Sequence, residues 1–430
     1  MSILRKRLTE FDDVLDADEI ETASLSKICF HGIPDEPGGL RPLCWKLLLN
    51  YLPPTKSSWL ETLKRKRELY NTFIEDLIVN PGESNTDDKE RVDVTLHDHP
   101  LNLNPDSKWQ TYFKDNEVLL QIDKDVRRLC PDISFFQQGT DYPCQKIVNA
   151  NGQRLHHRVQ HTVLKSANVE RKGLGVTKIL LVFALTLTWK AAGIIDDASK
   201  IAVSVRKATE DYAPLAEGGE AHWEVLERIL FIYAKLNPGQ GYVQGMNEIV
   251  GPIYHAFACD PDPTWRKHAE ADTFFCFTNL MAEIRDFFIK TLDEAEFGIN
   301  SMMSKLTNQV RANDPEVWLR LHQQELCPQY YSFRWLTLLL SQEFPLPDVM
   351  RIWDSLFADE NRFNFLIHIC CAMILNNLRS LNTCVCIFRL LRDQLLAGDF
   401  ATNVKLLQNF PSMDIQIVLS KAAALAGKTL

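Results

Sequence analysis

The sequence predicts an all-helical protein, and three observations lead to that fold class. Apolar residues recur at helical spacing in the stretches 222–236, 273–284, 333–340, 346–356 and 363–375. Alternating β-branched runs between hairpin turns are scarce, so a large sheet is not expected. No repeat of fixed period is present, which argues against a regular solenoid. We therefore expect one large, irregular helical domain.

Composition and charge narrow the functional classes. The 430 residues are 46% hydrophobic and 24% charged, which is ordinary for a globular protein with a large core. The net charge of −9 argues against general nucleic-acid binding. Eleven cysteines without a Cys-x-x-Cys pair indicate reduced thiols in the cytoplasm. We interpret the basic run from Lys64 to Arg67 as a solvated helix face, with a nuclear signal or lipid-binding patch as the alternative.

Membrane attachment is expected to be indirect. The N-terminus lacks the apolar run of a secretory signal, and Ser2 stands where myristoylation requires glycine. The apolar stretch 179–195 is interrupted by Lys190 and is short of the roughly 20 residues of a spanning helix. We expect it to pack on the domain as a helix or strand. A membrane anchor, or an unusual splice form or gene model, is the alternative.

Two stretches predict loops or insertions. Residues 80–107 are rich in Pro, Gly, Asn and Asp, with Pro81-Gly82 and Asn104-Pro105 as helix breakers. Residues 145–219 mix polar stretches with the apolar one and end at Glu217-Gly218-Gly219. We interpret 145–219 as a variable insertion into one domain.

A helix precedes the insertion, and we expect Asp115 or Asn116 to cap it and Pro131 to end it. At 100° per residue its core-facing stripe is made up of Val118, Leu119, Ile122, Val126 and Leu129. Asp125 and Arg128 form a pair on one flank of the stripe, and Asp123 and Arg127 form a pair on the other. Ordinary helix ion pairs explain both, at about a few tenths of a kcal/mol each. Periodicity does not choose between the two arginines.

The helix predicted at 222–236 stops at Asn237-Pro238-Gly239, and a glycine-rich string follows it. Residues 239–245 superficially match a dinucleotide-binding fingerprint, but the third glycine is one place late and the preceding element is a helix. A close-packed helix connection is the simpler explanation. The string Tyr242-Val243-Gln244-Gly245-Met246-Asn247 is more specific.

Two further patterns carry no chemistry. Residues 422–429 fit a loose phosphate-loop pattern, but only Leu430 is left to form the helix that such a loop requires. No acid or cysteine completes a ligand set around His156, His157 and His161, so no metal site is predicted.

The string around Gln244 and the earlier Ile122-x-x-Asp125-x-x-Arg128 pattern together resemble the paired signatures of the TBC-domain family, which accelerates GTP hydrolysis by Rab-type small GTPases. Other segments resemble the same family: Gly32-Ile33-Pro34, Leu40-Arg41 with Trp45, His99-Pro100-Leu101, Trp109 to Asp115, Arg334-Trp335-Leu336, Glu343-Phe344 and Arg351 to Asp354.

The resemblance implies a domain organisation: an N-terminal segment (1–31), a TBC domain of two helical halves (32–375) with the variable insertion 145–219, and C-terminal helices packed on it (376–430). It also implies the residue roles. Arg128 would be the arginine finger and Gln244 the glutamine finger. Asp125 would hold Arg128, and Tyr242, Gly245 and Asn247 would bind the GTPase or support the loop. Arg334, Trp335, Trp353 and Asp354 would be structural.

The implied partner is a GTP-bound Rab, which would bring the GTP and Mg²⁺, so no cofactor and no catalytic turnover of the chain's own are expected. Arginine neutralises charge on a transferring phosphoryl group, and glutamine orients the attacking water. We expect a cytoplasmic regulator of vesicle trafficking that is recruited peripherally to membranes through the Rab. The alternative is a helical scaffold that binds a Rab without stimulating hydrolysis.

Overall fold

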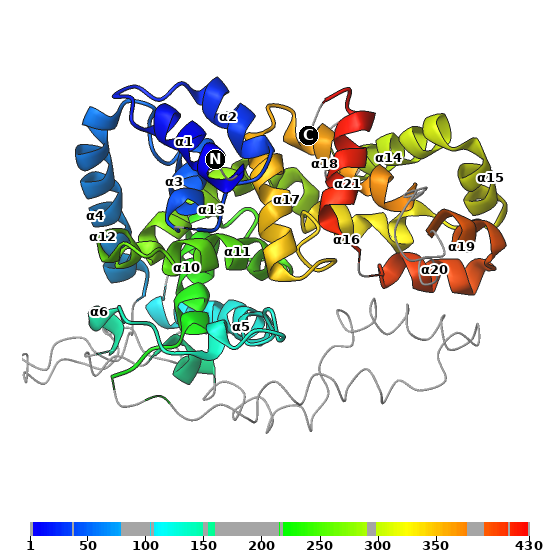
Figure 1. Ribbon diagram of the computed structural model, residues 1–430. Helices are drawn as coiled ribbons and strands as arrows, with labels where there is room; N and C mark the ends of the chain where they lie inside the picture. The colour runs from blue at the N-terminus through cyan, green and yellow to red at the C-terminus, as the bar shows by residue number, and fades with distance from the viewer. Residues whose placement is uncertain are drawn as a thin grey trace, which may run out of the picture. The chain divides into compact units, whose positions relative to one another are not determined.

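The computed structural model describes residues 3–36, 38–78, 104, 107–148, 154–159, 215, 218–289, 298–375, 391–411 and 413–428. These residues are predominantly helical (Figure 1), and β structure among them is limited to two isolated bridges, Glu19 with Thr55 and Gly139 with Ala221. The all-helical prediction is confirmed. Among the helices so described, none combines the length and apolar character needed to cross a bilayer.

The chain divides into two compact units, one discontinuous in sequence and the other continuous. Unit 1 comprises Met1–Glu68 and Glu248–Leu430, and unit 2 comprises Leu69–Asn247. The N-terminal helices assigned to unit 1 are α1 (Ile3–Leu15), α2 (Thr22–Phe30), α3 (Leu40–Leu48), η1 (Lys56–Ser58) and the first half of α4 (Trp59–Leu77). Its later helices are most of α11 (Met246–Ala258), α12 (Pro263–Arg266), α13 (Ala269–Ile284), η4 (Arg285–Phe288), α14 (Ile299–Asn313), α15 (Pro315–Gln323), η6 (Pro328–Tyr330), α16 (Ser332–Thr337), α17 (Leu346–Ala358), α18 (Arg362–Ile374), α19 (Leu391–Ala397), α20 (Phe400–Gln408) and α21 (Ile415–Leu425).

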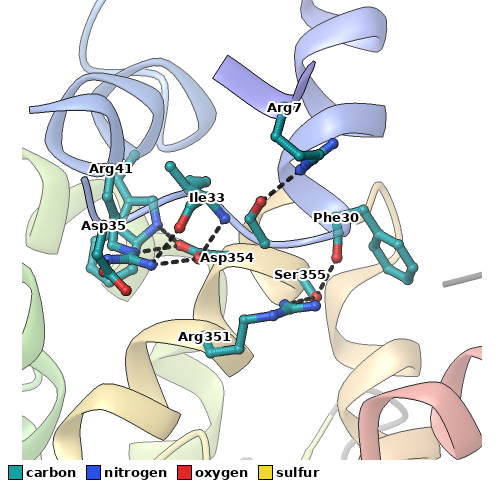
Figure 2. A network of polar contacts seen from close by, with 10 residues as sticks. Arg7, Phe30, Ile33, Asp35, Arg41, Arg351, Asp354 and Ser355 are labelled. Carbon is teal, nitrogen blue, oxygen red and sulfur yellow. Dashed lines mark hydrogen bonds and ion pairs between the residues drawn. The ribbon is translucent and has the colours of Figure 1, made fainter. Parts of the chain in front are cut away.

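Unit 1 is organised around α17 and α18. Helix α17 packs on α2 and α18, and α18 in turn packs on α14 and α21 (Figure 1). At the contact of α17 with α2 and α3 lies the fully buried carboxylate of Asp354. It accepts hydrogen bonds from the Ile33 backbone N–H (3.0 Å), the Arg41 guanidinium (2.9 and 3.0 Å) and the Trp45 indole N–H (2.9 Å) (Figure 2). Four donors on one carboxylate satisfy a group whose burial would otherwise be costly.

The other motif residues of unit 1 also make internal contacts. The Trp353 indole donates to the Leu339 carbonyl at 3.0 Å. Arg334 pairs through two nitrogens with Glu343 and donates to the Gln408 carbonyl, while Trp335 is completely buried. The structural role that the resemblance implies for Arg334, Trp335, Trp353 and Asp354 stays a prediction.

The basic run 64–67 differs from the predicted solvated helix face. Lys64 and Arg65 are exposed, but Arg67 forms two hydrogen bonds with the buried carboxylate of Asp272 (2.9 and 2.8 Å), and Lys66 is half-buried over the Tyr51 ring (4.7 Å). Half of the predicted solvated face therefore turns inward, because a buried acid far away in the sequence needs a cationic partner.

Unit 2 contains the second half of α4, α5 (Lys108–Val126), η3 (Phe135–Gln137), α6 (Gln145–Val148) and α10 (His222–Leu236). Helices α5 and α10 pack side by side (Figure 1) and run antiparallel, because Lys235 at the end of α10 pairs with Asp115 early in α5, while Trp223 near the start of α10 lies against Arg127 at the end of α5. Unit 2 is built around this contact between α5 and α10.

Observed helix limits agree with several sequence predictions. Helix α10 begins and ends at the predicted residues. Helices α13, α17 and α18 contain almost all of the stretches predicted for them, and α13 begins four residues earlier. The helix predicted over 333–340 is shorter than predicted. Helix α16 ends at Thr337, because Leu339 and Leu340 adopt positive φ angles.

Most of the predicted insertion 145–219, including the apolar stretch 179–195, lies outside the described residues. Among the described residues of this stretch, 154–159 contact both main helices of unit 2. Arg158 is buried and donates to the Asn116 carboxamide on α5 at 3.0 Å, and Arg154 pairs with Glu224 on α10 at 3.2 Å.

Candidate functional site

Helix α5 begins earlier than the sequence suggested. Ser107 is its N-cap, and the Ser107 hydroxyl accepts a hydrogen bond from the Trp109 backbone N–H at 3.1 Å. The predicted caps were wrong, because both side chains have partners inside the unit. Asp115 accepts from the Lys235 ammonium (2.9 Å), and Asn116 accepts from Arg158 (3.0 Å).

The predicted apolar stripe positions the end of α5. Leu119, Ile122, Val126 and Leu129 are at most 1% exposed, and Val118 is partly exposed. Regular α-helix ends at Val126. Arg128 therefore lies in the turn that follows the helix, a position where backbone and side chain are not constrained by a further helical turn.

The structure distinguishes the two arginines that periodicity could not separate. The Arg127 Nε donates to Asp123 at 2.8 Å, and its guanidinium carbon lies 3.9 Å from the centre of the Trp223 ring. Arg128 also has an acidic partner, Asp125, at 2.6 Å, but its side chain is 48% exposed. Of these two guanidinium groups, that of Arg128 is the more accessible to a partner.

Asp125 connects the arginine turn to the glutamine segment. Its carboxylate is buried, and one oxygen accepts from Arg128 while the other accepts from the Tyr242 hydroxyl at 2.7 Å. The Asn247 carboxamide donates to the Asp125 backbone carbonyl at 3.3 Å. Segments that are more than 110 residues apart in sequence therefore meet at one acidic residue.

The glutamine segment is shaped by two glycines. Gly241 and Gly245 have φ angles of 67° and 105°, a region that side chains with a β-carbon rarely adopt. The Gly241 N–H donates to the Asn237 carbonyl at 2.7 Å, which closes the turn after α10. Gln244 is exposed and lies in the turn directly before α11. The predicted finger residues are thus both exposed, on segments bridged by Asp125.

Helix α10 carries two buried acidic residues, Glu224 and Glu227, that the sequence did not single out. Burial raises the pKa of Glu227 well above its ordinary value, and the nearby Asp123 adds to that rise. Burial would also raise the pKa of Glu224, but the hydrogen bond from His156, with help from the Ala221 N–H and Arg154, lowers it. Glu224 is therefore ionised at neutral pH, whereas the raised pKa of Glu227 favours its protonated form.

The histidines have a structural explanation where they are described. His156 lies 3.2 Å from Glu224 and contacts the Trp223 ring edge-to-face. Within the described part of the chain, no three His, Cys, Asp or Glu side chains gather in a way that could hold a metal ion.

Known proteins of one family resemble this chain in sequence and in fold. The model of the Rab-GTPase-TBC domain matches residues 204–381. The human protein named TBC1 domain family member 13 is 53% identical over 427 residues, with 99% of this chain and 98% of that protein covered. The chain belongs to the TBC-domain family. A TBC domain-containing protein from Schizosaccharomyces pombe is 36% identical and is covered over 72% of its length.

The fold agrees with this membership. The crystal structure of the Ypt/Rab-GAP domain of Gyp1p superimposes with a TM-score of 0.62 at 22% identity, and 99% of each chain is covered. The residues matched by the TBC-domain model include Gln244 but not Arg128. Helix α5 is instead covered by the similarity to the member 13 proteins, which extends over 99% of the chain.

Proposed function

We propose that this chain is a GTPase-activating protein that stimulates GTP hydrolysis by a Rab-family small GTPase. The observation that carries the proposal is the pair of exposed side chains, Arg128 and Gln244, on two segments joined through Asp125. Two further findings support it: the chain is a TBC-family member, and its fold is that of a domain described as a Ypt/Rab-GAP.

Each finger has a distinct chemical task in this proposal. The Arg128 guanidinium neutralises negative charge that develops on the transferring phosphoryl group, and its planar fork offers several donors to the phosphate oxygens. Gln244 orients the water that attacks the γ-phosphate, a task otherwise performed by a glutamine of the GTPase. The Rab brings the GTP and Mg²⁺, so this chain supplies no cofactor and turns over no substrate alone.

The residues around Arg128 and Gln244 hold these two fingers in place. Asp125 accepts from Arg128 and from Tyr242 at the same time, so it fixes the arginine turn and the glutamine segment relative to each other. Asn247 ties the start of α11 to the Asp125 backbone. The positive φ angle of Gly245 allows the chain to turn directly after Gln244.

The cellular role follows from the partner. A Rab activator acts where GTP-bound Rabs reside, so we propose a cytoplasmic protein that is recruited peripherally to membranes by its Rab and regulates vesicle trafficking. A scaffold that binds a Rab without stimulating hydrolysis is the competing function.

A single-turnover assay on a panel of GTP-loaded Rabs tests the proposal. We expect the wild-type protein to accelerate hydrolysis by at least one Rab, and Gln244→Ala to remove most of that acceleration. Gln121→Ala is a matched control, because Gln121 is also exposed and lies in the same unit. Saturable binding with unchanged hydrolysis across the panel would support the scaffold instead.

A further inference from the structure

The residue that precedes Arg128 is held at several points. The Arg127 Nε donates to Asp123 at 2.8 Å, and its guanidinium carbon lies 3.9 Å from the centre of the Trp223 ring. Its backbone N–H donates to the Asp123 carbonyl at 3.2 Å, and its carbonyl accepts from the Gln137 side chain at 3.3 Å. Arg127 is thus fixed through both its backbone and its side chain.

The Trp223 ring is itself held in place. It is 7% exposed, and the His156 ring packs against it edge-to-face at 5.4 Å. The next residue, Glu224, lies 3.2 Å from both His156 and Arg154, and it also accepts from the Ala221 N–H at 3.1 Å. The start of α10 therefore presents the indole as a rigid surface.

Arg128 directly follows the fixed residue Arg127 in the chain. Among the described residues, its side chain pairs with Asp125 and donates to the Lys124 carbonyl at 2.8 Å, its backbone N–H donates to the Asp125 carbonyl at 3.2 Å, and half of its side chain faces solvent. Regular helix has already ended at Val126. The Arg128 side chain therefore leaves the backbone directly after a residue that is fixed through both its backbone and its side chain.

We propose that Trp223 and Arg127 are positioning residues for the arginine finger: the indole holds Arg127, and Arg127 holds the turn from which Arg128 reaches the nucleotide of the GTPase. This inference rests on the proposed function. In this inference, neither Trp223 nor Arg127 contacts the nucleotide. A misplacement of about 1 Å at a catalytic group can lower a rate by about 100-fold, so loss of a single cation–π contact at this position has a kinetic effect beyond its effect on stability.

The test compares Trp223→Leu with a matched control elsewhere in unit 2. The Arg158 guanidinium carbon lies 4.1 Å from the Tyr112 ring centre, so Tyr112→Leu removes a cation–π contact of similar geometry near the other end of α5, far along the helix from Arg128. Trp223→Phe keeps an aromatic face for Arg127 and serves as the rescue variant. Values of kcat and KM for a responsive Rab, together with melting temperatures, are measured for all three variants and for the wild-type protein.

We expect Trp223→Leu to lower kcat about tenfold while KM for the Rab changes less than about twofold. Trp223→Phe should recover most of the kcat, and Tyr112→Leu should lower the melting temperature without lowering kcat. Should Trp223→Leu fail to fold, Arg127→Met removes the same contact from the other side and is expected to give the same split between kcat and KM.

Three results would overturn the inference: an unchanged kcat in Trp223→Leu, an equal fall of kcat in Tyr112→Leu, or a rise in KM in place of the fall in kcat. A wild-type protein that accelerates hydrolysis by no Rab would be a different failure, that of the proposed function. The two failures are therefore distinguishable in one experiment.

Discussion

Replacement of Arg128 by lysine separates a catalytic arginine from a structural one. Arg128 is 48% exposed and makes one ion pair and one hydrogen bond to a carbonyl, so its loss costs at most about 1 kcal/mol of folding free energy. An arginine finger contributes about 10³–10⁵ in hydrolysis rate, which corresponds to about 4–7 kcal/mol of transition-state stabilisation. Lysine keeps the charge but lacks the planar fork. We therefore expect Arg128→Lys to remove nearly all stimulation while the melting temperature changes little.

Arg127→Lys is the matched control for that variant, because it makes the same chemical change one residue away. Lysine can still place a cation over Trp223 and pair with Asp123, so we expect Arg127→Lys to lose no more than about tenfold in rate. Single-turnover GTP hydrolysis on a responsive Rab measures both variants. If Arg127→Lys were as damaging as Arg128→Lys, the assignment of the finger would be refuted.

Three further predictions test the supporting residues. Tyr242→Phe removes the hydrogen bond to Asp125 and should cost about 1 kcal/mol in urea unfolding, with a several-fold loss of stimulation; unaltered activity would argue against the bridge. Asp354→Asn removes the buried acidic partner of Arg41, whose other acidic partner, Asp35, is largely exposed, and should destabilise the protein by about 3–5 kcal/mol; a loss below about 1 kcal/mol would contradict the buried pair. Burial raises the pKa of Glu227 above 4.5, so the folded state keeps a proton that the unfolded chain releases. The free energy of unfolding therefore falls as pH rises from 4.5 to the raised pKa of the folded state. Glu227→Gln should therefore raise the melting temperature more at pH 8 than at pH 5, and an equal effect at both would count against a raised pKa.

Local patterns in the sequence predicted some features of the site accurately. The limits of α10 follow from apolar periodicity and the Asn237-Pro238 stop, and both were observed. The pairing of Asp125 with Arg128 and of Asp123 with Arg127 follows from helical spacing alone, and both pairs are present. Such features depend on residues within one or two helical turns of each other.

Features that depend on distant residues were not predictable in this way. The predicted start of α5 was wrong because Asp115 is a residue type common at helix N-caps but is paired here with Lys235, 120 positions later. The sequence predicts a solvated Arg67 because the partner that buries it, Asp272, is 205 positions away. The different surroundings of Arg127 and Arg128 likewise depend on Trp223, which lies on another helix.

A crystal structure of this protein bound to a Rab that carries GDP, Mg²⁺ and an aluminium fluoride mimic of the transferring phosphoryl group would show whether both side chains reach the nucleotide. We expect the Arg128 guanidinium to lie within hydrogen-bonding distance of the fluoride group and the Gln244 carboxamide to contact the water in line with it. A complex in which either side chain points away from the nucleotide, or in which a glutamine of the Rab positions that water, would contradict this expectation.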